Sequence, residues 1–197
     1  MDLVRASHLY KVFGKNERQV IERLKAGESR EELASLGTAA VIDVSFEVAK
    51  GETFVVMGLS GSGKSTLIRM INGLWSPSEG TVEVAGKVVS DMNDAQLRAL
   101  RRDHVSMVFQ HFALLPHLTV RENAAYGLKL QGKLKQKERL EKANEWLNTV
   151  GLNGWGDKYP HQLSGGMQQR VGLARALAAE TDILLMDEAF SALDPHI

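Results

Sequence analysis

The stretch "GLSGSGKST" at residues 58–66 follows directly after the apolar run "TFVVM" at residues 53–57. It fits the pattern G-x-x-x-x-G-K-[ST] through Gly58, Gly63, Lys64 and Ser65. Glycine lets the main chain curl until successive N–H groups point at one anion, and a helix that begins near Lys64 adds the positive end of its dipole. We expect this turn, between a buried strand and a helix, to hold a nucleoside triphosphate.

Two side chains in the turn suit that ligand. Lys64 can neutralise the β- and γ-phosphates, and Ser65 can offer its hydroxyl to Mg²⁺. The turn also places Ser60, Gly61, Ser62 and Thr66 beside the phosphates. A glycine-rich turn with an incidental lysine is the alternative, but the flanking strand and helix patterns favour the phosphate site.

Hydrolysis also needs a carboxylate near the metal and a group that orients water. The run "ILLMDE" at residues 183–188 has the pattern of a buried strand that ends in two acids. We expect Asp187 to belong to the Mg²⁺ shell and Glu188 to act as general base on the attacking water. Gln110, at the end of another expected strand, can contact both the metal and the water.

A second helix start carries the sequence "LSGGMQQR" at residues 163–170. Ser164 and two glycines open this helix and again present main-chain donors at a helix N-terminus. One interpretation is an N-cap serine with flexible glycines. The other is a half-site that closes on a phosphate held by a second molecule.

Composition limits the class of protein. The chain has 197 residues, of which 44% are hydrophobic and 24% are charged, its charges cancel, and it has no cysteine. Disulfides and thiolate metal sites are therefore excluded, and no global charge favours nucleic acid. No apolar run reaches the roughly 20 residues of a membrane helix. We expect a cytoplasmic protein.

Hydrophobic patterning predicts an α/β core. Strands are expected at residues 41–48, 53–57, 105–109 and 183–186, with a hairpin at 81–89 that turns near Ala85 and Gly86. Helices are expected at residues 93–102, through much of 110–160, and after Ser164. Within the helical middle, one face carries Leu140, Ala143, Leu147 and Val150, and Gly151 ends the helix.

Residues 14–40 read as a helical insertion near the N-terminus. Ser29 and Glu32 fit a capping box, Leu33 and Leu36 follow, and Gly37 ends the expected helix. The simplest interpretation is a solvated surface excursion without chemistry.

In this order, the motifs "GLSGSGKST", Gln110, "LSGGMQQR", "ILLMDE" and "SALD" resemble the ATP-binding subunit of an ABC transporter. The stretches "SMVFQHFALLPHLTVRENAAYGL" and "LLMDEAFSALDP" are similar to the ATPase of the glycine betaine/proline (quaternary amine) importers. The Ala-Phe pair after Glu188 and the insertion after "KVFG" point to the same subgroup. The resemblance implies a P-loop NTPase of the ABC ATPase type, whose mixed or parallel sheet core carries an antiparallel β subdomain and an inserted helical subdomain.

The resemblance also implies boundaries and residue roles. Residues 1–110 would form the nucleotide-binding core with the β subdomain, 111–162 the helical subdomain, and 163–197 the return to the core. Phe13 would stack on adenine, with Tyr10 as the alternative. The signature loop, which contacts the γ-phosphate in a partner subunit, would comprise Ser164, Gly165, Gly166 and Gln168. Asp194 would couple the two sites across the dimer.

The partners follow from the same resemblance. ATP and Mg²⁺ would bind between head-to-tail subunits, and a groove that begins near Gln110 would accept a coupling helix of the membrane permease. Phe112, Leu114 and Leu115 would line this groove or belong to the core. A substrate-binding protein would act indirectly, nucleic acid would not be a partner, and the chain would lie at the cytoplasmic face of the plasma membrane.

The sequence stops at "SALDPHI", residues 191–197, before the strand and Thr-His-Asp motif with which the family continues. We therefore expect a C-terminally truncated chain that aggregates or stays partly unfolded when made alone. The leading hypothesis is an ATP hydrolase that powers uptake of quaternary amines. The alternatives are an importer ATPase for another solute, such as an amino acid, and a nucleotide-binding module without turnover.

Overall fold

The computed structural model describes residues 2–109 and 113–187. The chain divides into two compact units, residues 1–98 and 99–197, and each is described by itself. In the described residues no helix is long and apolar enough to cross a membrane.

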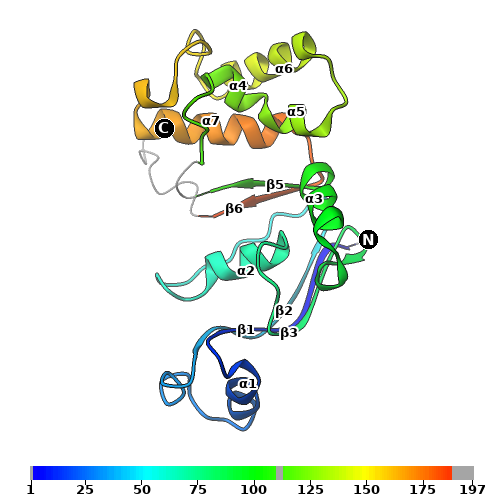
Figure 1. Cartoon of the computed structure of the whole chain (residues 1–197), viewed down its shortest axis with the longest axis vertical. Coiled ribbons are helices and arrows are strands. Elements are labelled where there is room, and N and C mark those ends of the chain that lie inside the picture. The colour runs from blue at the N-terminus through cyan, green and yellow to red at the C-terminus, as the bar shows by residue number, and fades with distance from the viewer. Residues whose placement is uncertain (1, 110–112, 188–197) are drawn as a thin grey trace. The chain divides into compact units, whose positions relative to one another are not determined.

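The first unit contains an antiparallel sheet in the order β2-β1-β3-β4. Three of its strands, β1, β2 and β3, are labelled in Figure 1. Its strands are β1 (Asp2–Phe13), β2 (Thr38–Ala49), β3 (Glu79–Val84) and β4 (Lys87–Val88). The expected alternation in β2 is confirmed, because Val44, Phe46 and Val48 are half-buried between exposed neighbours. The expected hairpin is also confirmed: Ala85 and Gly86 have φ values of 50° and 75°, as a tight two-residue turn requires.

The connection between β1 and β2 is the insertion, and it has a core of its own. Helix α1 (Glu17–Lys25) buries Val20 and Ile21, which pack with Leu33 against Tyr10 and Val12 of β1. The expectation of a merely solvated excursion is therefore wrong. These apolar side chains need a partner surface, and β1 supplies one.

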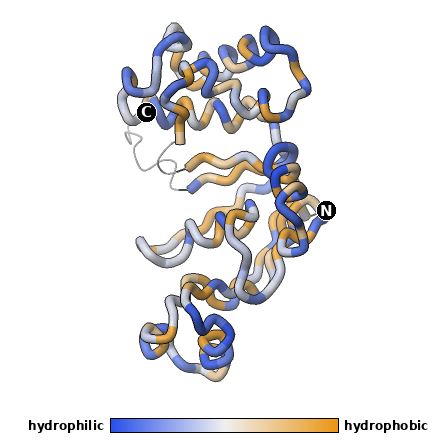
Figure 2. The backbone as a smooth tube through the Cα atoms, in the orientation of Figure 1, coloured by the Kyte–Doolittle hydropathy of each residue, from blue (hydrophilic) through white to orange (hydrophobic). Residues whose placement is uncertain are grey.

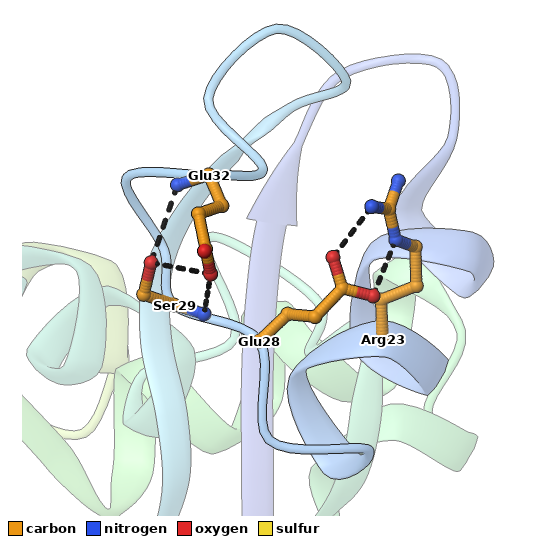
Figure 3. A network of polar contacts seen from close by, with 4 residues as sticks. All are labelled: Arg23, Glu28, Ser29 and Glu32. Atoms are coloured by element: carbon orange, nitrogen blue, oxygen red, sulfur yellow. Dashed lines mark hydrogen bonds and ion pairs between the residues drawn. The ribbon is translucent and has the colours of Figure 1, made fainter.

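Within the insertion, polar contacts join Arg23 to Glu28 and Ser29 to Glu32 (Figure 3). The guanidinium of Arg23 on α1 donates to the carboxylate of Glu28 at 2.7 Å. The main-chain N–H of Ser29 donates to Glu32 at 2.8 Å, and the N–H of Glu32 donates back to the Ser29 hydroxyl at 3.3 Å. The capping-box bonds are confirmed, but the helix expected after them is not, since the chain forms successive turns there.

The strand expected at residues 53–57 is wrong. The segment is non-repetitive and exposed, with Met57 exposed at 88%, although the Phe54 ring stacks on Phe46 at 4.8 Å. A strand exists only as a member of a ladder. The apolar run indicates a preference for extended structure, but no ladder of the described residues includes it.

The glycine turn leads into α2 (Lys64–Ile71), and the short helices η1 (Val89–Asp91) and α3 (Asp94–Asp103) follow the hairpin. Met70 of α2 is fully buried, and Leu67 is nearly so. Helix α2 contacts both β2 and β3. The helix that carries Lys64 is thus fixed against the sheet.

The second unit combines a parallel strand pair with a group of helices. Strands β5 (Val105–Val108) and β6 (Ile183–Met186) pair in register, and Figure 2 shows both as mainly hydrophobic. The remaining elements are α4 (Val120–Ala124), α5 (Tyr126–Gln131), α6 (Gln136–Thr149), η2 (Pro160–Gln162) and α7 (Gly165–Ala178). The helices lie to one side of the strand pair in Figure 1.

The helical core confirms the expected face of α6. Ala143 and Leu147 are buried with Val120 of α4 and Val171 of α7, and Leu140 and Val150 pack against this cluster. Gly151 has φ 73° directly after the helix, which suits the stop expected there. The helix carrying the serine-glycine motif is therefore packed against α4 and α6.

Candidate functional site

The glycine turn is closed by its own lysine. The Lys64 ammonium donates to the main-chain carbonyls of Gly58 at 2.7 Å and Leu59 at 2.9 Å. Ser60, Gly61 and Ser62 are exposed, and Gly61 has φ 77°, a conformation that glycine adopts without strain. Ser60, Gly61 and Ser62 thus lie in one exposed loop ahead of α2, and the other residues expected at the phosphates, Lys64, Ser65 and Thr66, lie in the first turn of that helix.

Gly63 fixes this loop to the sheet. A Cβ atom at Gly63 would lie 2.0 Å from the main-chain oxygen of Ala40, and Gly63 has φ 93°. Ala40 lies at a register shift, since Lys11 pairs with Val41 and Val12 pairs with Ala39. The shift leaves Ala40 as the extra residue of a β-bulge, a feature that often lies next to functional sites.

The N-terminus of α2 fits an anion. Gly63 occupies the N-cap position and supplies no side-chain acceptor. The first N–H groups of a helix have no carbonyl partner within that helix, and the helix dipole places positive potential there. Thr66 is buried and Ser65 is half-buried in the first turn. The donor set therefore fits phosphate, as the sequence predicts.

Phe13 lies at the end of β1, opposite Thr38. Thr38 precedes the bulged Ala40 by two residues, which corresponds to about 7 Å along a strand, with about 5 Å between paired strands. The aromatic ring is thus attached to the same part of the sheet as the glycine turn. Phe13 is 38% exposed, whereas the alternative, Tyr10, is 5% exposed and packs in the insertion's core. Exposure favours Phe13 over Tyr10 as a stacking surface.

Asp187 directly follows β6 in the second unit. It is 2% exposed, and its main-chain N–H donates to the carbonyl of Val108 at 3.1 Å. This bond extends the parallel pairing by one residue and places the carboxylate-bearing residue at the C-terminal edge of the strand pair. Parallel sheets commonly bind ligands at that edge.

The serine-glycine helix start is preorganised. The Ser164 hydroxyl accepts from the N–H of Met167 at 3.3 Å, and Ser164 and Gly165 are exposed. The Gln168 side-chain amide donates to the carbonyls of Pro160 at 3.0 Å and Leu163 at 3.2 Å. Gln168 therefore secures the segment that precedes the helix, a structural use that the sequence did not indicate.

Several expected site residues lie outside the described part of the chain: Gln110, Phe112, Glu188 and Asp194. Within residues 2–109 and 113–187, no group of three His, Asp or Glu side chains gathers to ligate a metal. Ser65 and Asp187 belong to different units. A Mg²⁺ ion, which usually keeps several waters and few protein ligands, would suit the Ser65 hydroxyl in the first turn of α2.

The second unit also has a hollow of about 280 Å³. Tyr126, Gly127 and Leu130 of α5 line it together with Met107 of β5 and the segment around Leu115. Leu114, by contrast, packs against the helical core. The Arg175 guanidinium, also in the lining, donates to the carbonyl of Ala113 at 2.8 Å. Burial lowers the pKa of Arg175.

Residues 41–191 match the ABC transporter family, a span that contains the glycine turn, the serine-glycine helix start and Asp187. The chain belongs to this family. The fold of this ABC protein agrees with that of the ATP-binding cassette MJ0796 in a post-hydrolysis dimer bound to ADP and Pi. That structure superposes with a TM-score of 0.84 at 34% identity, covering 98% of this chain and 77% of the cassette. The expected ABC ATPase fold class is confirmed.

Two curated relatives bear on the subgroup of this ABC protein. The glycine betaine transport ATP-binding protein OpuAA of Bacillus subtilis is 54% identical over 196 residues, which are 98% of this chain and 47% of OpuAA. The methionine import ATP-binding protein MetN of the same organism is 53% identical over 157 residues, 80% of this chain and 46% of MetN. The ABC chain thus spans about half the length of these relatives.

Two features near the turn have no motif in the sequence. The Ala40 bulge depends on the pairing register of β2, which alternation alone does not determine. Trp75 packs against Phe13 with ring centroids 5.0 Å apart. Its only sequence indication is a large aromatic residue in the turn "GLWSPSEG", where small and polar residues predominate.

Proposed function

We propose that this chain binds and hydrolyses ATP as the motor subunit of an importer for quaternary amines such as glycine betaine. The observation that carries the proposal is the contact of Gly63 with the Ala40 bulge. This contact attaches the glycine turn, which carries Lys64, to strands β1 and β2, whose pairing ends at Phe13. Phosphates and an aromatic base would thereby share one face of the first unit.

The roles divide by chemistry. Lys64 and the start of α2 would hold the β- and γ-phosphates, and the Ser65 hydroxyl and Asp187 would belong to the Mg²⁺ shell. The bound Mg²⁺ would neutralise charge on the phosphates. Gln110 would orient the attacking water, and Glu188 would take its proton.

The exposed serine-glycine start of α7 supports a shared site. Ser164 caps the helix with its own hydroxyl, and the neighbouring Gly165 has nothing within 4 Å of where a Cβ would be. An anion can therefore approach the main chain closely. We place the γ-phosphate of a second copy there, in a head-to-tail dimer with Asp194 coupling the two sites.

The solute assignment rests on the length of the match. The similarity to OpuAA runs over 196 residues and so includes the insertion, whereas the similarity to MetN runs over 157. Glycine betaine or a related quaternary amine is therefore the favoured solute. An amino acid such as methionine is the second candidate, since the two relatives are nearly equally identical to this chain, each over its own matched length.

The hollow beside α5 supports a membrane partner. Its lining is mainly apolar, with Leu130 57% exposed, and the Ala113–Leu115 segment directly follows the region of Gln110. A short helix of a permease would fit there, at the cytoplasmic face of the membrane. A change in the nucleotide bound near Gln110 would in this way be transmitted to the permease.

The deciding experiment is transport by the assembled importer. Glu188→Gln should abolish ATP hydrolysis and glycine betaine uptake while ATP still promotes dimer formation, and Lys64→Ala should remove ATP binding itself. Uptake of methionine in place of glycine betaine would favour the second candidate. Normal hydrolysis by Glu188→Gln would refute the proposed base.

A further inference from the structure

The exposed Phe13 ring has two ordered neighbours. Trp75 meets it in an edge arrangement, with an interplanar angle of 76°, and the Lys11 ammonium lies over the Phe13 ring at 5.2 Å from its centroid. Edge-to-face aromatic pairs favour defined ring orientations. The Phe13 ring plane is therefore set by a contact, even though 38% of the residue is exposed.

Trp75 is itself held by the end of α2. The main-chain N–H groups of Leu74 and Trp75 both donate to the carbonyl of Arg69, at 2.9 and 3.0 Å, and the Arg69 guanidinium lies 4.9 Å from the Trp75 ring centroid. Gly73 makes the intervening bend with φ 67° and packs near Leu97. The indole thus has fixed supports on both its main chain and its ring.

Helix α2 thereby connects two parts of the nucleotide site. Its first turn contains Lys64 and Ser65, and its last turn carries Arg69, which supports Trp75. The Ala40 bulge also links Gly63, which precedes this helix, to strands β1 and β2, whose pairing ends at Phe13. Base and phosphate contacts are therefore attached to the same short helix.

We infer that Trp75 is a positioning residue for purine recognition, which orients the Phe13 ring so that the base of a purine nucleoside triphosphate stacks on it. This inference rests on the proposed function. The base takes the place of the Lys11 ammonium over the ring, since an exposed cation–π contact is weak. Trp75 acts through Phe13 and so affects affinity for the base.

Trp75 can report on its own role. In the variant Trp146→Phe/Trp155→Phe, Trp75 is the remaining tryptophan of the three in the sequence. ATP should change its emission, whereas inorganic tripolyphosphate, which lacks a base, should bind without that change. Binding of both ligands is measured independently by calorimetry.

Substitution tests the same role. Trp75→Leu should raise the Kd for ATP about 3- to 10-fold, the loss expected from one aromatic pair, and leave the Kd for tripolyphosphate unchanged. Trp75→Phe should recover most of the ATP affinity. Trp155→Leu is the control, because it removes an indole from the second unit, whereas Phe13 belongs to the first, and it should change neither constant. Thermal melting monitored by circular dichroism confirms that each variant folds.

The outcomes separate the two proposals. The role of Trp75 is refuted if ATP binds without changing the Trp75 emission. It is also refuted if Trp75→Leu weakens the binding of ATP and of tripolyphosphate equally. In both cases the proposed phosphate site stands. If the unchanged chain melts cooperatively but binds neither ligand, the proposed function fails, and the role of Trp75 fails with it.

Discussion

Gly63 and Ala40 are in contact through the main chain: any Cβ at Gly63 would fall 2.0 Å from the Ala40 oxygen. The glycine turn is therefore attached to the sheet at a bulge, and the attachment leaves no room for a side chain. Gly63 also has φ 93°, which L-residues rarely adopt.

Gly63→Ala should consequently detach the turn from β2. The backbone strain of about 1–2 kcal/mol adds to the overlap with the Ala40 carbonyl, and together they should weaken ATP binding at least tenfold. Calorimetric titration with ATP measures the effect. Gly51→Ala is the control, since Gly51 has a similar φ of 81° but nothing near its Cβ position. Equal losses in both variants would contradict the importance of the contact.

The insertion should respond to acid. The Ser29 main-chain N–H and then its hydroxyl lower the pKa of Glu32, and the guanidinium of Arg23 lowers the pKa of Glu28. Groups with a depressed folded-state pKa stabilise the fold at pH values above their unfolded pKa, and this contribution is lost as the pH falls through the folded value. We expect the turns at residues 28–37 to loosen only once the pH has fallen below the ordinary pKa of a glutamate.

NMR titration of the Ser29 amide measures this directly. Its chemical shift should move as Glu32 is protonated, with a midpoint below that of an ordinary glutamate, and Glu32→Gln should remove the transition. A midpoint at or above the ordinary value would show that the Ser29 contacts do not hold the carboxylate.

The hollow beside α5 should matter for coupling and not for nucleotide affinity. Leu130→Ser reduces the apolar lining, so glycine betaine uptake by the assembled importer should fall several-fold while the Kd for ATP stays unchanged. Ile42→Ser serves as the control, because Ile42 is an exposed apolar residue on β2 in the first unit, whereas the residues that line the hollow belong to the second. Unchanged uptake with Leu130→Ser would argue against docking at this surface.

Local chemistry predicted much of this structure. The Ala85-Gly86 turn, the alternation of β2, the helix face around Leu147 and the Ser164 cap all depend on neighbours close in sequence, which patterning captures. The strand predicted from the apolar run at residues 53–57 was wrong, because a strand also requires a pairing partner, which composition does not specify. The burial of Val20 and Leu33 likewise depended on the unforeseen surface of β1.

In the candidate site, too, features that depend on sequence neighbours were predicted, and contacts between distant segments were not. The spacing of glycine, lysine and serine predicted the glycine turn ahead of α2, because the geometry of the turn is contained within nine residues, and its phosphate-binding role stays a prediction. Trp75 is separated from Phe13 by 62 positions, and Ala40 is separated from Gly63 by 23. Such contacts arise only when β1, β2 and α2 assemble, so no local pattern indicates them.

The central claim is that ATP bound at the glycine turn of one copy is also contacted by the N-terminus of α7, at Ser164, of another copy. Since the chain has no cysteine, disulfide crosslinking can test it cleanly. Copies with Ser60→Cys are mixed with copies carrying Ser164→Cys, both with Glu188→Gln, and oxidised with or without ATP. The account predicts an ATP-dependent crosslink between the two kinds of copy. A crosslink that forms equally without ATP, or none while ATP is bound, would contradict it.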